Sequence, residues 1–375
     1  MTGVKTTAFR LRPQRLGITP LVYLALVGIL LIGGLLVAAQ GGNLFSNANL
    51  VYLLTQSSLL GFVAIGQTLV ILCRSLDLSV GYVVALSSLV AATTMAGDTS
   101  RIPLAIGAVI VVAVVVGLVN GLMITKLKVN SFIATLGVGL IIKGYLDTQY
   151  KGPTGSVPQA FQAFGYTRMG FIPLSTVIMI AVAVAGIFFL RKTRTGYHMF
   201  AVGGDTEVAR MSGIRTDRTV IIAHCLCALG AGVAGLLLAA RFGTGSALIY
   251  DSGYDLESIA AVVLGGTYLL GGRGGIGGTV AGVMILAVLD TVFNVLAVDP
   301  FFKSVLRGVI IIVAVAIYAR QQLSAKGSRV RFPGGAGTSR PGRSGPGTTR
   351  RGTTQPPPSD PAPAAAVTAD QEVGR

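Results

Sequence analysis

Apolar runs of about 20 residues recur along the chain from Thr19 to Tyr318, and they restrict the fold more than any other feature. Each run is long enough to cross the hydrocarbon core of a bilayer, about 30 Å, as a helix. A helix satisfies its own backbone hydrogen bonds inside lipid, and the runs lack the alternating pattern of a transmembrane β-barrel. Charged residues are also scarce, at 12% of the chain, against about a quarter in soluble domains. The sequence therefore predicts an all-α polytopic membrane protein.

Ten apolar segments can be drawn, so we expect about ten transmembrane segments. Their approximate bounds are 19–39, 50–72, 78–96, 102–124, 131–149, 172–190, 219–240, 256–270, 276–297 and 302–319. The first follows a basic stretch, as the apolar core of a signal peptide would. It is long for such a core, and we predict that it is a retained span.

The third and eighth segments are not expected to be plain spans. The third opens with Asp77-Leu78-Ser79, and the eighth opens with Asp255-Leu256-Glu257 and ends in a glycine cluster. Because they are five segments apart, they must run in opposite directions. This suggests broken or re-entrant helices and an inverted repeat, segments two to five against seven to ten, whose broken helices meet near the bilayer centre. Coincidence of the two openings is the alternative.

Small residues predict close packing between helices. Gly117-x3-Gly121 and Gly278-x3-Gly282 are GxxxG pairs, and Ala231-x3-Gly235 is a variant of the same pattern. Three cysteines lack the spacing of disulfides or metal ligands and are expected to fill helix interfaces: Cys73, Cys225 and Cys227.

The basic residues predict orientation and domain limits. Most of them lie on the cytosolic side if the N-terminus does, so we expect both termini in the cytosol of a multi-pass cell-membrane protein. Residues 1–18 form a basic N-terminus, 19–320 the transmembrane domain with a cytosolic loop at 191–218, and 321–375 a disordered tail rich in Pro, Gly and Arg. The net charge of +16 does not indicate nucleic acid, because the basic residues lie in loops and tails beside apolar spans. The arginines of the tail could contact anionic membrane lipid headgroups, and a solvated tail is the favoured alternative.

The loop at 191–218 is the longest polar interruption between apolar runs and holds six basic and three acidic residues. Within it, the stretch from Asp205 to Gly213 predicts one short helix that follows Gly203 and Gly204. Asp205 is the expected N-cap, Glu207 lies in the first turn, Arg210 in the last turn, and Gly213 ends the helix. We predict that a partner outside the membrane binds this helix and thereby displaces the membrane spans.

The sequence lacks the common motifs of nucleotide binding and catalysis. The chain contains no Walker A loop, no HExxH and no GxSxG, and its two histidines, His198 and His224, have no nucleophile near them in sequence. The stretch 272–277 matches GxGxxG, but it lies between membrane segments and is expected to be a close-packed reversal. We therefore expect no catalytic residue, no metal and no cofactor in this chain.

Ionisable residues at membrane depth are costly and are candidates for function. Lys143 and Asp147 lie four residues apart on one helical face and are expected to pair. Asp290 shares a face of the ninth segment with Asn294, and Lys303 shares one of the tenth with Arg307. A polar path could use Asp290, Asn294 and Arg307; hydrogen bonds between helices are the equal alternative.

Taken together, several stretches resemble the permease subunits of ABC importers for monosaccharides of the ribose, xylose and galactose type. The resemblance covers about residues 19–320, in the order of the family. It is carried by residues 76–81, 119–122, 130–137, 202–214, 260–267 with 271–274, and 305–308.

The resemblance implies a homodimer of ten-segment subunits, an extracytoplasmic sugar-binding protein, and a separate cytosolic ATPase that binds ATP and Mg. The helix at 205–213 would be the coupling helix on which the ATPase docks, with Asp205, Glu207, Ala209, Arg210 and Gly213 as its defining residues. By the same resemblance, residues in segments that line or gate the pathway include Asp77, Ser79, Phe132, Thr135, Asn294 and Arg307. Asp290 is added from its place on the ninth segment, where members of the family usually have an Asn pair in place of Asp290-Thr291.

Other functions stay open at this point. A secondary transporter or facilitator of a small polar solute would need no ATPase. Permeases for nucleosides, autoinducers or branched-chain amino acids look much alike, so the solute is not fixed by the motifs. A membrane-embedded enzyme is disfavoured because no nucleophile, base or metal constellation is present.

Overall fold

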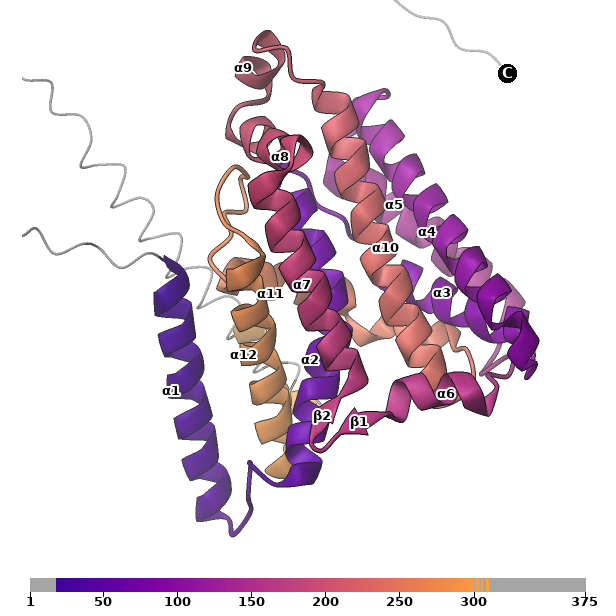
Figure 1. Cartoon of the computed structure of the whole chain (residues 1–375), viewed down its shortest axis with the longest axis vertical. Coiled ribbons are helices and arrows are strands. Elements are labelled where there is room, and N and C mark those ends of the chain that lie inside the picture. The colour runs from indigo at the N-terminus through magenta and orange to yellow at the C-terminus, as the bar shows by residue number, and fades with distance from the viewer. Residues whose placement is uncertain (1–17, 300, 304, 306–307, 310–375) are drawn as a thin grey trace, which may run out of the picture. The chain divides into compact units, whose positions relative to one another are not determined.

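A computed structural model of the chain describes residues 18–299, 301–303, 305 and 308–309 (Figure 1). Within these residues, seven helices are long and apolar enough to cross a membrane, which confirms the all-α polytopic fold. They are α1 (Ile18–Ala39), α2 (Asn47–Leu72), α4 (Ile102–Thr125), α5 (Ser131–Gln149), α7 (Leu174–Lys192), α10 (Thr216–Phe242) and α12 (Ile276–Val295). Each begins and ends within three residues of its predicted segment.

Several predictions concern residues that lie outside the described part of the chain. They are the basic N-terminus up to residue 17, most of the tenth segment with Arg307, and the tail at 321–375.

The third and eighth segments form short helices, as predicted. α3 (Val80–Met95) has 16 residues and α11 (Tyr254–Leu264) has 11, both fewer than the roughly 20 that a plain span needs. α11 ends earlier than residue 270, because Gly265 begins a reversal in which Gly266 and Gly271 have positive φ.

The first turns of these two short helices lie against each other. A Cβ atom on Gly81 would be 3.7 Å from the backbone nitrogen of Asp255, and the rings of Tyr82 and Tyr250 stack with centroids 5.8 Å apart. A non-helical stretch at 73–79 precedes α3, and the 3-10 helix η2 (Ala247–Ser252) precedes α11. The contact agrees with the predicted meeting of two broken helices.

Two helices occupy the centre of the bundle. α2 is buried almost continuously from Leu53 to Leu72, and α10 packs against α2, α3 and α4. The predicted glycine contacts are present: a Cβ on Gly117 would lie 2.6 Å from Cα of Cys225, and one on Gly282 would lie 2.0 Å from the carbonyl oxygen of Ala261. All three cysteines are free.

The two ends of the bundle differ in their short elements. Figure 1 shows α8 (Arg194–Gly204) and α9 (Thr206–Met211) at one end, which we call the α9 end. At the other, the α6 end, lie α6 (Gln159–Tyr166) and the antiparallel hairpin of β1 (Arg168–Met169) and β2 (Ile172–Pro173). The 3-10 helix η1 (Thr99–Arg101) precedes α4.

Candidate functional site

The helix predicted in the polar loop is α9, and its ends are those expected. Oδ1 of Asp205 accepts hydrogen bonds from the backbone nitrogens of Glu207 and Val208, both at 3.0 Å. Gly213 has φ +81° and donates its N–H to the carbonyl of Arg210 at 2.9 Å. Both ends are satisfied locally, so this helix of only six residues has a defined geometry.

One face of α9 is anchored and the other is open. Ala209 is buried, whereas Val208 and Met211 expose 60% and 88% of their surface. Glu207 and Arg210 pair at 3.3 Å beside these two side chains and remain exposed. An apolar tip flanked by charges is a surface suited to contact with another protein.

A second helix, α8, precedes α9 in the same loop and was not predicted from the sequence. Gly203 and Gly204, expected before the helix, form the last turn of α8. Thr193 caps its first turn, with its hydroxyl accepting from the backbone nitrogen of Gly196 at 3.1 Å. The buried positions Gly196, Met199, Val202 and Gly203 have helical spacing, so the sequence did contain a signal for this helix.

The end of α8 rests directly on the rest of the bundle. A Cβ on Gly203 would lie 1.8 Å from the carbonyl oxygen of Leu72 and 2.5 Å from the nitrogen of Gly272. That same nitrogen donates to the Leu72 carbonyl at 3.0 Å. Gly272 belongs to the GxGxxG stretch, which is therefore the close-packed reversal that was predicted.

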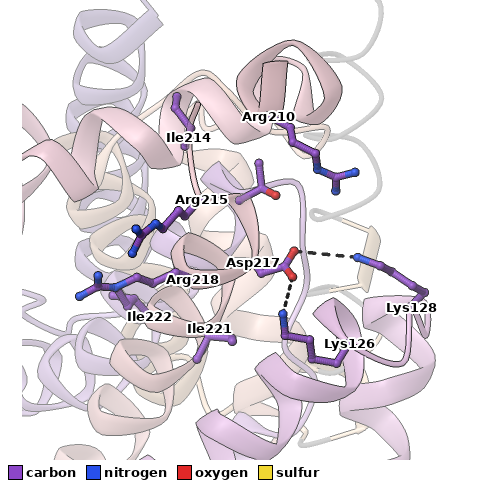
Figure 2. A pocket seen from close by; sticks show the side chains of 10 residues that line it. Lys126, Lys128, Arg210, Ile214, Arg215, Asp217, Arg218, Ile221 and Ile222 are labelled. Atoms are coloured by element: carbon purple, nitrogen blue, oxygen red, sulfur yellow. Dashed lines mark hydrogen bonds and ion pairs between the residues drawn. The ribbon is translucent and has the colours of Figure 1, made fainter. Parts of the chain in front are cut away.

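A basic groove of about 770 Å³ lies beside α9 (Figure 2). Asp217 accepts from Nζ of Lys126 at 2.8 Å and lies 3.9 Å from Nζ of Lys128. Three further arginines leave the groove electropositive, and isoleucines supply its apolar surface. Its lining residues are Lys126, Lys128, Arg210, Ile214, Arg215, Thr216, Asp217, Arg218, Ile221 and Ile222.

A fully buried polar network lies where α3 begins. Nδ1 of His224 and Oδ2 of Asp77 are 3.0 Å apart, and Nε2 of His224 is 2.9 Å from Oγ of Ser75. Ser79 donates its hydroxyl to Oδ1 of Asp77 at 2.6 Å, and Nδ2 of Asn120 donates to Oγ of Ser79 at 2.8 Å. The network thereby joins the non-helical stretch before α3 to α4 and α10.

Ser75, His224 and Asp77 are hydrogen-bonded in the same sequence, serine to histidine to aspartate, as the catalytic triad of a hydrolase. Here Asp77 and His224 expose none of their surface and Ser75 exposes 4%, so a substrate has no access to the hydroxyl. We therefore interpret the group as a structural fastening. Among the described residues, no three His, Cys, Asp or Glu side chains gather as they would around a metal ion.

Replacement of His224 is expected to destabilise the protein strongly. His224→Ala removes two hydrogen bonds and leaves the buried Asp77 carboxyl without its imidazole partner, a loss of about 3–5 kcal/mol for a buried pair. The measurement is the thermal unfolding midpoint of the purified protein in detergent. His198→Ala, at a half-buried position, is the control and should change the midpoint little. Equal midpoints for the two variants would contradict the fastening role.

The residues predicted to line a pathway lie in separate places. Asp77, Ser79 and Thr135 are buried together, with Oγ1 of Thr135 accepting from the nitrogen of Leu78 at 3.0 Å. Phe132 is exposed at the start of α5. At the end of α12, Asn294 donates to the Tyr52 hydroxyl at 2.8 Å and accepts from Lys303. Their roles in transport stay predictions.

Asp290 lies one helical turn before Asn294 and lines a cavity of about 410 Å³, whose lining also includes Tyr52, the hydrogen-bond partner of Asn294. The cavity is enclosed by α2, the last turns of α10, η2, the first turns of α11, and α12. Its lining residues are Tyr52, Gln56, Leu59, Leu60, Leu238, Arg241, Phe242, Ile249, Ser252, Tyr254, Glu257, Leu286, Ala287 and Asp290.

The pair predicted within the fifth segment is present. Nζ of Lys143 donates to Oδ2 of Asp147 at 2.7 Å, and the Tyr250 hydroxyl donates to the same carboxylate. Nζ also lies 4.4 Å from the centre of the Tyr250 ring. This group joins α5 to η2, which supports the structural interpretation of the pair.

Comparison with known proteins finds one matching family and a group of curated relatives. The family described as branched-chain amino acid transport system / permease component matches residues 49–315. The ribose import permease protein RbsC of Escherichia coli K12 is 36% identical over 292 residues, which are 76% of this chain and 90% of the relative. RbsC of Bacillus subtilis is 37% identical over 273 residues, 72% of this chain and 84% of the relative.

The relatives include a second sugar permease. The galactose/methyl galactoside import permease protein MglC of Haemophilus influenzae is 33% identical over 315 residues, 79% of this chain and 91% of the relative. No solved structure matches the chain.

Proposed function

Because the chain belongs to the family of branched-chain amino acid transport system permease components, we propose that it is the transmembrane subunit of an ATP-binding cassette importer that carries a monosaccharide. The relatives named as ribose and galactose import permeases support the solute class. The observation that carries the proposal is α9, a locally capped helix with an exposed apolar tip at one end of a membrane bundle.

The proposed assembly has three further parts. A separate ATPase, which binds ATP and Mg, docks on α9 and its neighbouring basic groove. An extracytoplasmic binding protein delivers the sugar at the α6 end, and a second copy of the chain completes the pathway. In this orientation α9 and both termini lie in the cytosol, where the distribution of Lys and Arg favours them.

The proposed mechanism is mechanical. Closure of the ATPase displaces α9, and the short connection at 212–215 transmits the displacement to α10. His224 on α10 is bonded to Asp77, so the movement reaches the start of α3, where the two broken helices meet. Because α10 is rigid and contacts buried residues along its length, its displacement can open the pathway toward one side of the membrane and close it toward the other.

Branched-chain amino acids are the second candidate solutes, because the description of the matching family names them. Nucleosides and autoinducers, left open by the motifs, have no such observation in their favour.

Reconstitution tests the proposal. Proteoliposomes that hold this chain with its ATPase and binding protein should take up ribose or galactose only when ATP is present. Proteoliposomes that hold the chain alone should move neither sugar on a gradient, because the chain is driven from α9. Uptake by the chain alone would indicate a secondary transporter or facilitator instead, and ATP-dependent uptake of leucine without sugar would indicate the amino acid function.

A further inference from the structure

We infer that the cavity between α2, α10, α11 and α12 is a solute-contact site of the permease itself, shaped for a neutral polyhydroxylated molecule of monosaccharide size. This inference rests on the proposed function and names the residues that would recognise the solute during its passage. The cavity volume of about 410 Å³ lies within the range of roughly 300–1,000 Å³ that small-molecule sites occupy.

The side chain of Arg241 lines this cavity and holds a hydrogen-bond donor that no described residue uses. Its Nη1 atom is buried and makes no hydrogen bond with any described residue. A buried donor without an acceptor is costly, and more so when it is charged. A rotation of this side chain that brings Nη1 to the cavity would let it donate to an oxygen atom of a bound solute, which would remove the cost.

The remaining polar residues match the chemistry of hydroxyl groups. A sugar hydroxyl both donates and accepts. The carboxyl groups of Glu257 and Asp290 can accept from it, and the amide of Gln56 and the guanidinium of Arg241 can donate to it. Leucine, isoleucine, phenylalanine and alanine side chains supply the apolar part of the wall, so the lining offers both polar groups for hydroxyls and apolar surface for C–H groups.

Aromatic rings and charge restrict the solute further. Tyr52 and Tyr254 line the cavity and offer apolar faces to the C–H groups of a sugar ring. The lining holds two carboxyl groups and one guanidinium, and the ammonium group of Lys303 binds Asn294 one helical turn from Asp290, so opposite charges nearly balance around the cavity, as suits a neutral solute. A zwitterionic amino acid is the competing ligand, since its carboxylate could pair with Arg241 and its ammonium group with Glu257.

The position of the cavity links it to α9. Arg241 lies in the last turn of α10, and Arg218, which lines the basic groove, lies in the first. Their separation of 23 residues corresponds to about 35 Å along one helix. Displacement of α10 from its α9 end therefore changes the spacing of Arg241 from Glu257 on α11 and Asp290 on α12, which would let the site bind and release solute.

Transport kinetics test the inference. In proteoliposomes with the complete importer, Arg241→Gln should raise the KM for uptake of radiolabelled ribose or galactose by about 10- to 100-fold, as expected for loss of a charge-assisted hydrogen bond. Glu257→Gln should act in the same direction. Arg194→Gln, an exposed arginine at the start of α8 that does not line the basic groove, is the matched control and should leave the KM unchanged. Thermal midpoints establish that each variant is folded; if Arg241→Gln is not, Gln56→Ala replaces it.

A second measurement does not depend on transport. In the purified complex, the thiol introduced by Ser252→Cys should react with a maleimide more slowly in the presence of the transported sugar, whereas leucine should not protect it. The parent protein measures the background of Cys225, since Cys73 and Cys227 are buried.

The outcomes separate the two proposals. ATP-dependent sugar uptake with an unchanged KM in Arg241→Gln and Glu257→Gln would overturn the contact site while leaving the proposed function intact. Protection by leucine but not by sugar would also overturn it. If the wild-type importer shows no ATP-dependent uptake of any of the three solutes, the proposed function and the site fail together.

Discussion

Without α9, the assembled importer is expected to lose ATP-dependent uptake and its ATPase, while the remaining helices still insert in the membrane. Replacement of residues 205–213 by a Gly-Ser linker removes the apolar tip and the Glu207–Arg210 pair. It leaves the apolar spans unchanged, because the stretch lies between α8 and α10. Co-purification of the ATPase and uptake in proteoliposomes should both fall to background. Retained uptake would contradict the coupling role of this helix.

A single substitution makes the same test without shortening the chain. Met211→Asp places a charge at a side chain that is 88% exposed, so it should not disturb the fold. At the centre of a docking surface such a change costs about 2 kcal/mol or more, or roughly a 30-fold loss of ATPase affinity. Met169→Asp, at a methionine 61% exposed on the hairpin of the α6 end, is the control and should leave co-purification of the ATPase unchanged.

Alanine at Gly203 is expected to be among the most destabilising single-methyl changes in the described part of the chain. The added Cβ would overlap the carbonyl oxygen of Leu72, at 1.8 Å, and the nitrogen of Gly272, at 2.5 Å. Both are backbone atoms in packed elements, so neither can move aside as a flexible side chain would. We expect a loss of about 3 kcal/mol or more, the upper part of the range for overpacking.

The neighbouring glycine is the control for that change. Gly204 is exposed and has no atom within 4 Å of a Cβ position, so Gly204→Ala should be neutral or slightly stabilising. In detergent, Gly203→Ala should unfold about 6 °C or more below the wild type. A common unfolding midpoint for both variants would show that α8 does not rest on Leu72 and Gly272 as described.

The spans and α9 could be predicted because the interactions that define them are local. Lipid requires a run of apolar residues, and the run is visible in the chain. The capping of α9 joins Asp205 to residues two and three positions away, so the residue types at those positions reveal it. The pairing of Lys143 with Asp147 is local in the same sense, since both lie on one face of α5.

The second polar helix, α8, was missed although its buried positions have helical spacing. Its glycines and charges made the stretch read as a loop, while packing against Leu72 and Gly272 stabilises it. His224 was missed as a partner of Asp77 for a different reason. The two residues are 147 positions apart, and nothing local indicates which polar group lies opposite the other. The presence of a histidine within an apolar span was the one signal that could have singled it out.

By itself, the sequence determined that this is a membrane protein. It also determined the residues at which the spans begin and end, and the position of a capped polar helix between two of them. Each of these features depends on residues close together in the sequence: a run of about 20 for a span, and neighbours two or three positions apart for the cap of α9. Only the tertiary structure decided which polar side chains meet. Arg241 reaches a cavity with Gln56, Glu257 and Asp290 because four helices from distant parts of the chain converge there, and burial leaves its nitrogen with no described acceptor.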